Sequence, residues 1–176
     1  MGVTVLTAGH SNRSLDDFIA LLKAHGVERL VDIRTVPRSR HNPQFNRDAL
    51  PASLEQAGLR YSHMGSLGGL RHPRPDSTNS AWRNDSFRGY ADYMQSPEFE
   101  AALDQLIQAA ARERIAIMCA EAVPWRCHRS LVADALTARG EQVEHIMSET
   151  KRNPHSMTPF ARIGNGRVTY PGVDGI

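Results

Sequence analysis

The stretch Arg114-Ile-Ala-Ile-Met-Cys119 decides the fold, because it is the clearest β-strand signal in the chain. A short apolar run with β-branched residues is typical of a buried strand. Helical patterns lie on both sides of it. Residues 96–113 precede it, with Ser96 as the N-cap, and residues 128–139 follow it, with Gly140 after the last turn. This order of helix, strand and helix predicts a parallel sheet with covering helices.

The same alternation extends outward from this strand. Further strands are expected at residues 3–7, 29–33, 59–63 and 142–147, and further helices between Ser14 and Gly26, at residues 50–57 and at residues 86–94. The pattern predicts an α/β fold, a single domain with a mostly parallel open sheet of about five strands flanked by helices. We assign residues 1–147 to the α/β domain and residues 148–176 to a C-terminal covering tail of the same domain, with a small strand around residues 167–170.

The positive charge of the chain is carried almost entirely by arginine, since Lys23 and Lys151 are the only lysines. A guanidinium group suits phosphates, carboxylates and base edges. Residues 29–88 hold ten arginines against five acidic residues, which makes the segment net +5 and leaves the rest of the chain net −3. This basic segment favours an anionic small molecule or a nucleic acid as partner. A solvated face with scattered arginines is the alternative.

The start of the chain and its cysteine content bear on localisation. Residues 1–8 carry no basic leader, and no apolar run reaches the length of a membrane span, so we expect neither a signal peptide nor a membrane partner. Two cysteines without an export signal indicate reduced thiols. We therefore expect a cytoplasmic protein, and the sequence leaves its oligomeric state open.

Polar loops follow three of the predicted strands. Their side chains are His10, Ser11 and Arg13 after the first strand, Asp32, Arg34, Arg38, Ser39 and Arg40 after the second, and Cys119 and Glu121 after the strand at residues 114–119. In open α/β sheets, ligands bind beyond the carboxyl ends of the strands, where such loops converge. We therefore expect the three loops to form one anion-facing site. A fourth segment, residues 64–84, is rich in glycine and proline and has the length of a functional or mobile loop.

The loop from Cys119 to Arg129 holds the densest chemistry. A thiol that faces a helix N-terminus beside Arg126, His128 and Arg129 has its thiolate form favoured. Cys119 is therefore the candidate nucleophile, and the three basic side chains are candidate anion ligands. The alternative is that Cys119 and Cys127 are small apolar residues of the core.

Two further side chains are candidates for proton transfer at this site. Glu121 lies between the two thiols in sequence and is the candidate general acid or base. His10 titrates near neutrality and is the candidate partner base if the loops converge. The alternatives are a solvated loop position for Glu121 and a structural role for His10.

A metal site is the next possibility to weigh. Cys119, Cys127, His128 and His10 supply four ligand types that bind zinc, but their spacing fits no common zinc pattern, which places two ligands two to four residues apart in each half. The zinc-deaminase pattern also fails, because its two halves belong on separate helices. We therefore predict no cofactor and favour no metal, with zinc on these four residues as the alternative.

Residues 37–46 are a second polar feature, with a proline near each end. Arg38, Arg40, Gln44 and Asn46 offer planar hydrogen-bonding groups suited to a phosphate or a base edge. The alternative is an ordered surface loop whose arginines pair with nearby acids. Aromatic residues are sparse in the basic part of the chain, so an extended platform for stacking single-stranded nucleic acid is not predicted.

Several blocks of this sequence together resemble one family, the domain of unknown function 488. The matching blocks are Thr7-x-Gly9-His10-Ser11-x-Arg13-Ser14, Leu30-Val31-Asp32-Ile33-Arg34-x-x-Pro37-x-Ser39-Arg40, Pro43-Gln44-Phe45-Asn46, Leu67-Gly68-Gly69 and Cys119-x-Glu121-x-x-Pro124-x-x-Cys127-His128-Arg129. The resemblance covers nearly the whole chain and implies an α/β fold in a bacterial or archaeal cytoplasmic protein. It implies no reaction.

A weaker resemblance links the strand-end cysteine to rhodaneses and cysteine phosphatases, which place a cysteine in an anion-binding loop before a helix. Six residues separate Cys119 from Arg126 where those families have five, so the likeness is one of architecture only.

Three functional hypotheses follow from these residues. The first is an enzyme, a hydrolase or transferase, that acts on a phosphate-bearing substrate such as a nucleotide or nucleic acid. The second is a non-catalytic module in which the same arginines bind a nucleotide or nucleic acid. The third is a structural network in which Asp32, Glu121 and the arginines satisfy one another.

Overall fold

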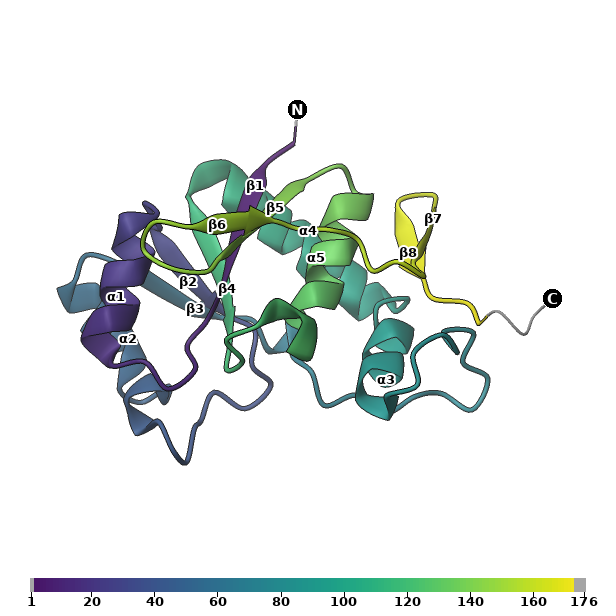
Figure 1. The fold of residues 1–176 in the computed structure, drawn as a ribbon, viewed down its shortest axis with the longest axis horizontal. Coiled ribbons are helices and arrows are strands. Elements are labelled where there is room, and N and C mark those ends of the chain that lie inside the picture. Colours follow the sequence, from purple (N-terminus) through teal and green to yellow (C-terminus); the bar gives the residue numbers. More distant parts are fainter. Residues whose placement is uncertain (1, 173–176) are drawn as a thin grey trace.

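The centre of the protein is a six-stranded sheet, shown in the computed structural model, which describes residues 2–172 (Figure 1). Its strands are β1 (Thr4–Gly9), β2 (Arg29–Asp32), β3 (Arg60–His63), β4 (Ile115–Cys119), β5 (Gln142–Ile146) and β6 (Arg152–Pro154). The spatial order is β3-β2-β4-β1-β5-β6, in which the first five strands are parallel and β6 pairs antiparallel with β5. The predicted α/β fold with a mostly parallel sheet is confirmed, and β6 adds an edge strand that the sequence did not predict.

The helices lie close to their predicted positions. They are α1 (Leu15–Ala24), α2 (Leu50–Gln56), α3 (Asp85–Tyr93), α4 (Pro97–Arg112) and α5 (Arg129–Ala138), with short 3₁₀ turns η1 (Pro43–Phe45), η2 (Gly65–Leu67) and η3 (Pro124–Arg126). Ser14 and Ser96 cap α1 and α4, each accepting a hydrogen bond from the backbone N–H three residues on. Within residues 2–172, none of the helices combines the length and the apolar character needed to cross a membrane.

The sheet separates two apolar cores. On one face, Val5 and Ile117 pack beneath α3, α4 and α5. On the other, Leu6 and Met118 pack beneath α1 and α2. Successive side chains of a strand point to opposite faces, so a strand buried on both faces is apolar throughout. This double burial explains why β4 gives the clearest strand signal in the sequence.

The segment after β5 is anchored by one buried carboxylate. Beyond β6, strands β7 (Arg162–Gly164) and β8 (Arg167–Thr169) form an antiparallel pair, and β8 lies where a small strand was predicted. Asp134 of α5 is fully buried and accepts hydrogen bonds from His155 Nε2, Thr158 Oγ1 and the Tyr170 hydroxyl, each at 2.7 Å. Residue 1 and residues 173–176 of the predicted tail lie outside the described residues.

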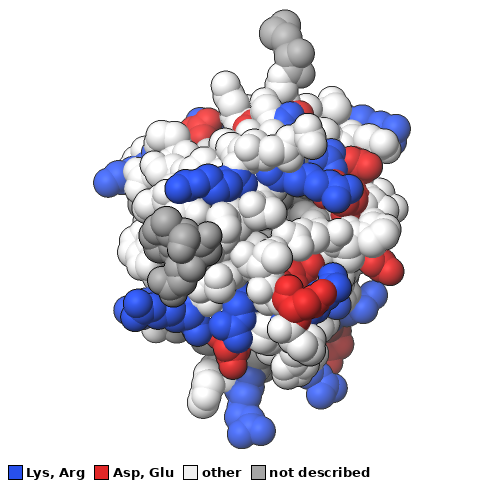
Figure 2. Space-filling view, turned by 90° about the vertical axis from the view of Figure 1, so that its right-hand side faces the viewer, with Lys and Arg blue, Asp and Glu red and all other residues white. Residues whose placement is uncertain are grey.

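Charged side chains of both signs are interspersed on the face turned toward the C-terminal end (Figure 2). Within the basic segment, half of the ten arginines pair with carboxylates: Arg29, Arg34, Arg60, Arg74 and Arg88. The excess positive charge of residues 29–88 is therefore partly neutralised within the protein.

The anchoring role of Asp134 yields a stability prediction. Asp134→Asn should lower the free energy of unfolding by about 3 kcal/mol, because an amide presents a donor where the buried carboxylate only accepts. Asp104→Asn is the matched control, since Asp104 is 55% exposed in its ion pair with Arg139 and should cost less than about 1 kcal/mol. Urea denaturation measures both variants, and equal stability of the two would contradict the anchoring role.

Candidate functional site

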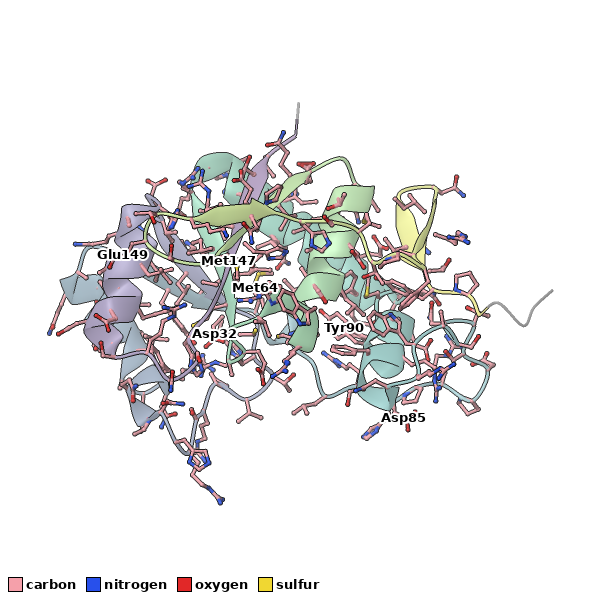
Figure 3. All side chains as sticks on the ribbon, viewed as in Figure 1. Asp32, Met64, Asp85, Tyr90, Met147 and Glu149 are labelled. Atoms are coloured by element: carbon pink, nitrogen blue, oxygen red, sulfur yellow. The ribbon has the colours of Figure 1, made fainter. Side chains whose placement is uncertain are left out.

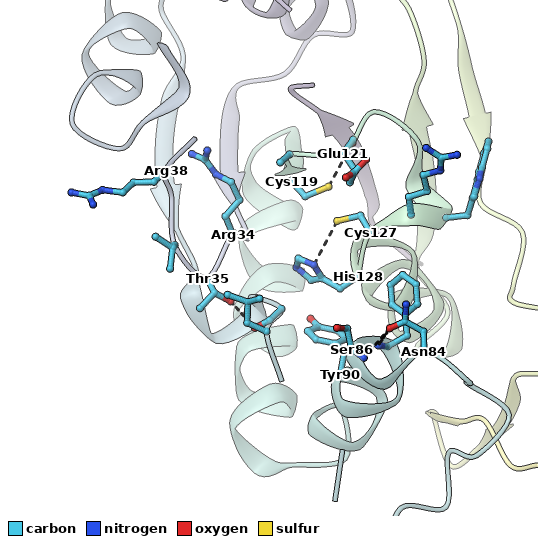
Figure 4. Close-up of a pocket in the computed structure, with 17 residues that line it drawn as sticks. Arg34, Thr35, Arg38, Asn84, Ser86, Tyr90, Cys119, Glu121, Cys127 and His128 are labelled. Atoms are coloured by element: carbon cyan, nitrogen blue, oxygen red, sulfur yellow. Dashed lines mark hydrogen bonds between the residues drawn. The ribbon is translucent and has the colours of Figure 1, made fainter. Parts of the chain in front are cut away.

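A pocket of about 700 Å³ lies beyond the carboxyl ends of β2 and β4 (Figure 4). These strands are neighbours, but β2 leads to α2 on one face of the sheet and β4 leads to α5 on the other. Adjacent strands whose loops go to opposite faces open a crevice between those loops. The pocket is lined by Arg34, Thr35, Val36 and Arg38 after β2, Gly69 and Leu70 after η2, Asn84, Ser86, Phe87 and Tyr90 at α3, and Cys119, Ala120, Glu121, Trp125, Arg126, Cys127 and His128 after β4.

The loop after β4 is held by the end of β1. The backbone N–H groups of His10 and Ser11 donate to the carbonyls of Cys119 and Ala120 at 3.0 and 2.9 Å, so the two chains stay paired beyond the strands. A Cβ atom on Gly9 would lie 1.6 Å from the Glu121 carbonyl oxygen. Only glycine permits this approach, which holds the segment from Cys119 to Glu121, whose residues line the pocket, against the end of β1.

Two thiols face each other in this pocket. Cys119 and Cys127 are both buried and free, and both line the pocket. In its protonated form Cys119 donates to the Glu121 carbonyl at 3.7 Å. Burial alone raises the pKa of Cys119, but the neighbouring Cys127 and the charge of Arg129 outweigh it, so the pKa lies below its usual value. The neighbouring Cys119, together with burial, raises the pKa of Cys127. Cys119 is therefore the thiol that ionises first.

Arg129 carries the positive charge behind these thiols. Its side chain is 1% exposed, and its Nη2 donates to the Ala122 carbonyl at 3.2 Å. Its Nε and Nη1 have no hydrogen-bond partner among residues 2–172. A buried guanidinium without a carboxylate is costly, and a nearby thiolate or bound anion offsets that cost. Arg129 does not line the pocket, so it acts on Cys119 through its field.

His128 is held neutral beside the second thiol. Burial lowers the pKa of His128 to about 4, and its Nε2 lies 3.1 Å from the Ile33 carbonyl. That carbonyl can only accept, so Nε2 carries the proton and Nδ1 is free to accept. Nδ1 lies 3.5 Å from the Cys127 sulfur. His128 thus positions Cys127 and does not serve as a cationic anion ligand at neutral pH.

Arg34 and Asp32 form a buried ion pair at the end of β2. The Arg34 Nη2 donates to Asp32 Oδ2 at 2.7 Å and to the Phe45 carbonyl at 2.6 Å, and the Tyr61 hydroxyl donates to the same carboxylate oxygen at 2.6 Å. Figure 3 shows Asp32 on the side of α1 and α2, away from Tyr90 on α3. Arg34 lines the pocket, but Asp32 neutralises much of its charge.

His10 lies behind this ion pair and does not line the pocket. It is 1% exposed and stacks on Phe45 with ring centroids 4.4 Å apart. Its Nδ1 lies 2.7 Å from the Ser11 carbonyl, and its Nε2 lies 3.5 Å from Arg34 Nη1. Burial lowers its pKa. The geometry gives His10 a role in positioning Arg34, and it leaves no direct route from the ring to a ligand in the pocket.

The loop after β2 is ordered by its own polar side chains. The Ser39 N–H donates to Asn46 Oδ1 at 2.6 Å, and Gln44 Nε2 donates to the Arg13 carbonyl at 3.0 Å. Of the predicted ligands on this loop, Arg38 lines the pocket, whereas Arg40 is exposed outside it.

The structure therefore brings together seven of the predicted residues and leaves the others outside the pocket. Those that line it are Arg34, Arg38, Cys119, Glu121, Arg126, Cys127 and His128. Those that do not line it are His10, Ser11, Arg13, Asp32, Ser39, Arg40, Gln44, Asn46 and Arg129.

Sequence reasoning missed the wall that α3 contributes, whereas residues 69–70 of the same wall fall within the segment 64–84 that was singled out as a functional or mobile loop. Tyr90 donates to the Leu67 carbonyl at 2.7 Å, and its ring centroid lies 4.9 Å from that of His128. No sequence pattern indicates that α3 lines this pocket, because a contact between segments far apart in the chain does not alter the hydrophobic periodicity of either segment. The glycines at residues 68–69 were the available signal, since a Cβ on Gly68 would lie 2.3 Å from Thr35 Oγ1.

The four alternative zinc ligands do not form a metal site in this geometry. Among residues 2–172, no group of three or more His, Cys, Asp or Glu side chains is arranged to hold a metal ion. His10 is turned toward Arg34, and His128 Nε2 is engaged by the Ile33 carbonyl.

Comparison with known proteins gives one match. Residues 14–136 match the family described as Domain of unknown function DUF488, and this span contains every residue that lines the pocket. No curated protein and no solved structure matches the chain.

The thiol pair yields a prediction about reactivity. Cys127→Ala removes the neighbouring thiol that lowers the pKa of Cys119, so the inflection of alkylation rate against pH should move to higher pH. At neutral pH the alkylation rate of Cys119 should fall by roughly tenfold for each unit by which its pKa rises. Iodoacetamide labelling with mass-spectrometric site mapping measures this rate. Cys127→Ser keeps a donor and is the control that should retain most of the rate; equal rates in wild type and Cys127→Ala would contradict the role of Cys127.

Proposed function

The chain belongs to the family Domain of unknown function DUF488, and we propose that it is an enzyme that uses Cys119 as a nucleophile on a phosphate-bearing substrate. One observation carries the proposal. The thiol that ionises first lies at the carboxyl end of a central strand, within a pocket, beside a buried arginine that has no carboxylate partner. Such surroundings are typical of reactive cysteines and not of packing cysteines.

The charges of the pocket support an anionic substrate. Arg38 and Arg126 are exposed on its wall, and neither forms an ion pair with a carboxylate within residues 2–172. Their guanidinium groups bind the phosphate and hold the substrate against Cys119. Glu121 is the carboxylate on the same wall, and it exchanges protons with the leaving group and with water.

Catalysis then proceeds in two steps. The Cys119 thiolate attacks the phosphorus atom and forms a sulfur–phosphorus bond while the phosphorus–oxygen bond to the leaving group breaks, and the Glu121 carboxyl group donates a proton to the leaving oxygen. A water molecule or second substrate releases the intermediate, with Glu121 accepting its proton. Throughout, Arg129 stabilises the negative sulfur from behind, where it does not compete with the substrate for space.

A protection experiment tests this proposal. Inorganic phosphate and nucleoside phosphates should slow iodoacetamide labelling of Cys119, because the bound anion covers the thiol. Arg126→Gln should weaken that protection by roughly tenfold, the effect expected for the loss of one charge-assisted hydrogen bond. Arg162→Gln, on the exposed strand β7 outside the pocket, is the matched control and should leave protection unchanged.

Turnover is measured in the same samples by ³¹P NMR and should be absent in Cys119→Ser. If no phosphate compound changes the labelling of Cys119 in the wild-type protein, the proposed substrate class is wrong.

A binding module for nucleic acid is the second candidate, favoured by one observation. Arg38, Arg40 and Arg47 are all exposed on the loop after β2, and Arg38 also lines the pocket. A short oligonucleotide is therefore included in the protection experiment. Protection by the oligonucleotide that weakens steeply with salt, without turnover of any phosphate compound, would favour the module over the enzyme.

A further inference from the structure

A second pocket of about 550 Å³ adjoins the first, and Trp125 lines both. It lies between the N-terminal end of α5, strands β5 and β6, and residues 153–160. It is lined by Trp82, Pro124, Trp125, Phe160, Met147 and Met157, together with Ser130, His145, Asn153, Pro154, His155, Ser156, Thr158 and Pro159. The first pocket carries three arginines and a carboxylate, whereas aromatic, methionine and proline side chains dominate the second.

Among the described residues, the second pocket has no acidic residue, lysine or arginine in its lining, and His145 in its wall is uncharged at neutral pH. Burial, followed by the nearby His155 and Arg129, lowers the pKa of His145 to about 3. A charged ligand group would find no partner here, so the pocket selects against charge.

The two histidines are already engaged in one hydrogen-bonded chain. His155 Nε2 donates to Asp134 at 2.7 Å, His155 Nδ1 lies 2.9 Å from His145 Nε2, and His145 Nδ1 lies 2.6 Å from Thr7 Oγ1. The two rings thus engage each other, whereas the buried Trp82 Nε1 has no hydrogen-bond partner among residues 2–172. The pocket therefore offers chiefly aromatic and thioether surface, together with one unpaired donor. Such walls suit a flat heteroaromatic ring.

Exposed apolar side chains line the first pocket, and one of them, Trp125, also lines the second. Trp125 is 67% exposed, Leu70 is 76% exposed and Val36 is 54% exposed, and all three line the first pocket. Within residues 2–172 only one other large hydrophobic side chain is comparably exposed. A solvated tryptophan between a cationic pocket and an uncharged aromatic pocket fits a ligand that has both kinds of group.

We infer that the ligand is a nucleotide whose phosphate lies in the first pocket and whose heteroaromatic base lies in the second, across Trp125. The position of the phosphate group rests on the proposed function. The position of the base rests on the lining of the second pocket. Stacking of a base on an aromatic side chain strengthens binding by roughly fivefold to a hundredfold. The second pocket is therefore a base subsite that sets the affinity for substrate, and it lies away from Cys119.

Binding of ligand pairs tests the base subsite. The chain has two tryptophans, so ¹⁹F NMR of protein labelled with 5-fluorotryptophan reports Trp82 and Trp125 separately. AMP, GMP, CMP and ribose 5-phosphate are each titrated. At least one nucleotide should bind at least roughly tenfold more tightly than ribose 5-phosphate and should shift both signals. If none binds more tightly than ribose 5-phosphate, the subsite is refuted.

A variant that fills the second pocket with a large side chain tests whether the base of the nucleotide binds there. Ser156 is exposed, lines only the second pocket, and its side chain makes no hydrogen bond within residues 2–172. Ser156→Trp should abolish the preference for the nucleotide while leaving ribose 5-phosphate affinity unchanged. Ala52→Trp, at an exposed position of α2 outside both pockets, is the matched control and should keep the preference. A preference that survives Ser156→Trp would refute the location.

The outcomes separate this inference from the proposed enzyme. Nucleotide binding with the expected preference but no turnover would overturn the enzyme and leave the base subsite standing. Turnover of a phosphate compound together with equal binding of nucleotides and ribose 5-phosphate would leave the enzyme standing and overturn the subsite.

Discussion

The close contact between the end of β1 and the loop after β4 is the constraint on which the site depends. Gly9 lies so near the Glu121 backbone that any side chain would displace the loop. Two backbone hydrogen bonds past the strand ends keep the loops in register. A loop free to move by an ångström would separate Cys119 from Cys127 and from the field of Arg129. The chemistry of the thiol is therefore a consequence of backbone packing between two neighbouring strands.

Electrostatics then decides which thiol in the pocket has the lower pKa. Arg129 is more deeply buried than either exposed arginine of the pocket, and it has no carboxylate among residues 2–172 to balance it. Arg34 is also buried, but Asp32 neutralises it. The unbalanced charge of Arg129 lowers the pKa of Cys119, whereas the neighbouring Cys119 and burial raise the pKa of Cys127. A carboxylate beside Arg129 would have removed that asymmetry.

The fold was predictable from the sequence to a greater extent than the site. Strands buried on both faces and well-capped helices give local signals, and rules of strand order place Cys119, Glu121 and Arg34 at one edge. The direction in which a loop side chain points leaves no such signal in the sequence. His10 follows β1 as expected, yet it turns inward to stack on Phe45. β6 escaped prediction because a three-residue polar edge strand resembles a loop in sequence.

The second pocket gives the segment after β5 a structural role in addition to covering the sheet. Residues 153–160 supply much of the wall of the second pocket, and Asp134 fixes them through His155 and Thr158. Asp134 lies on α5, whose first turn also carries Arg129. One helix therefore carries Arg129 at its start, two residues after Cys127, and anchors the wall of the second pocket along its length. Because both pockets depend on the same rigid helix, their separation is fixed, and a ligand that spans them must match it in length.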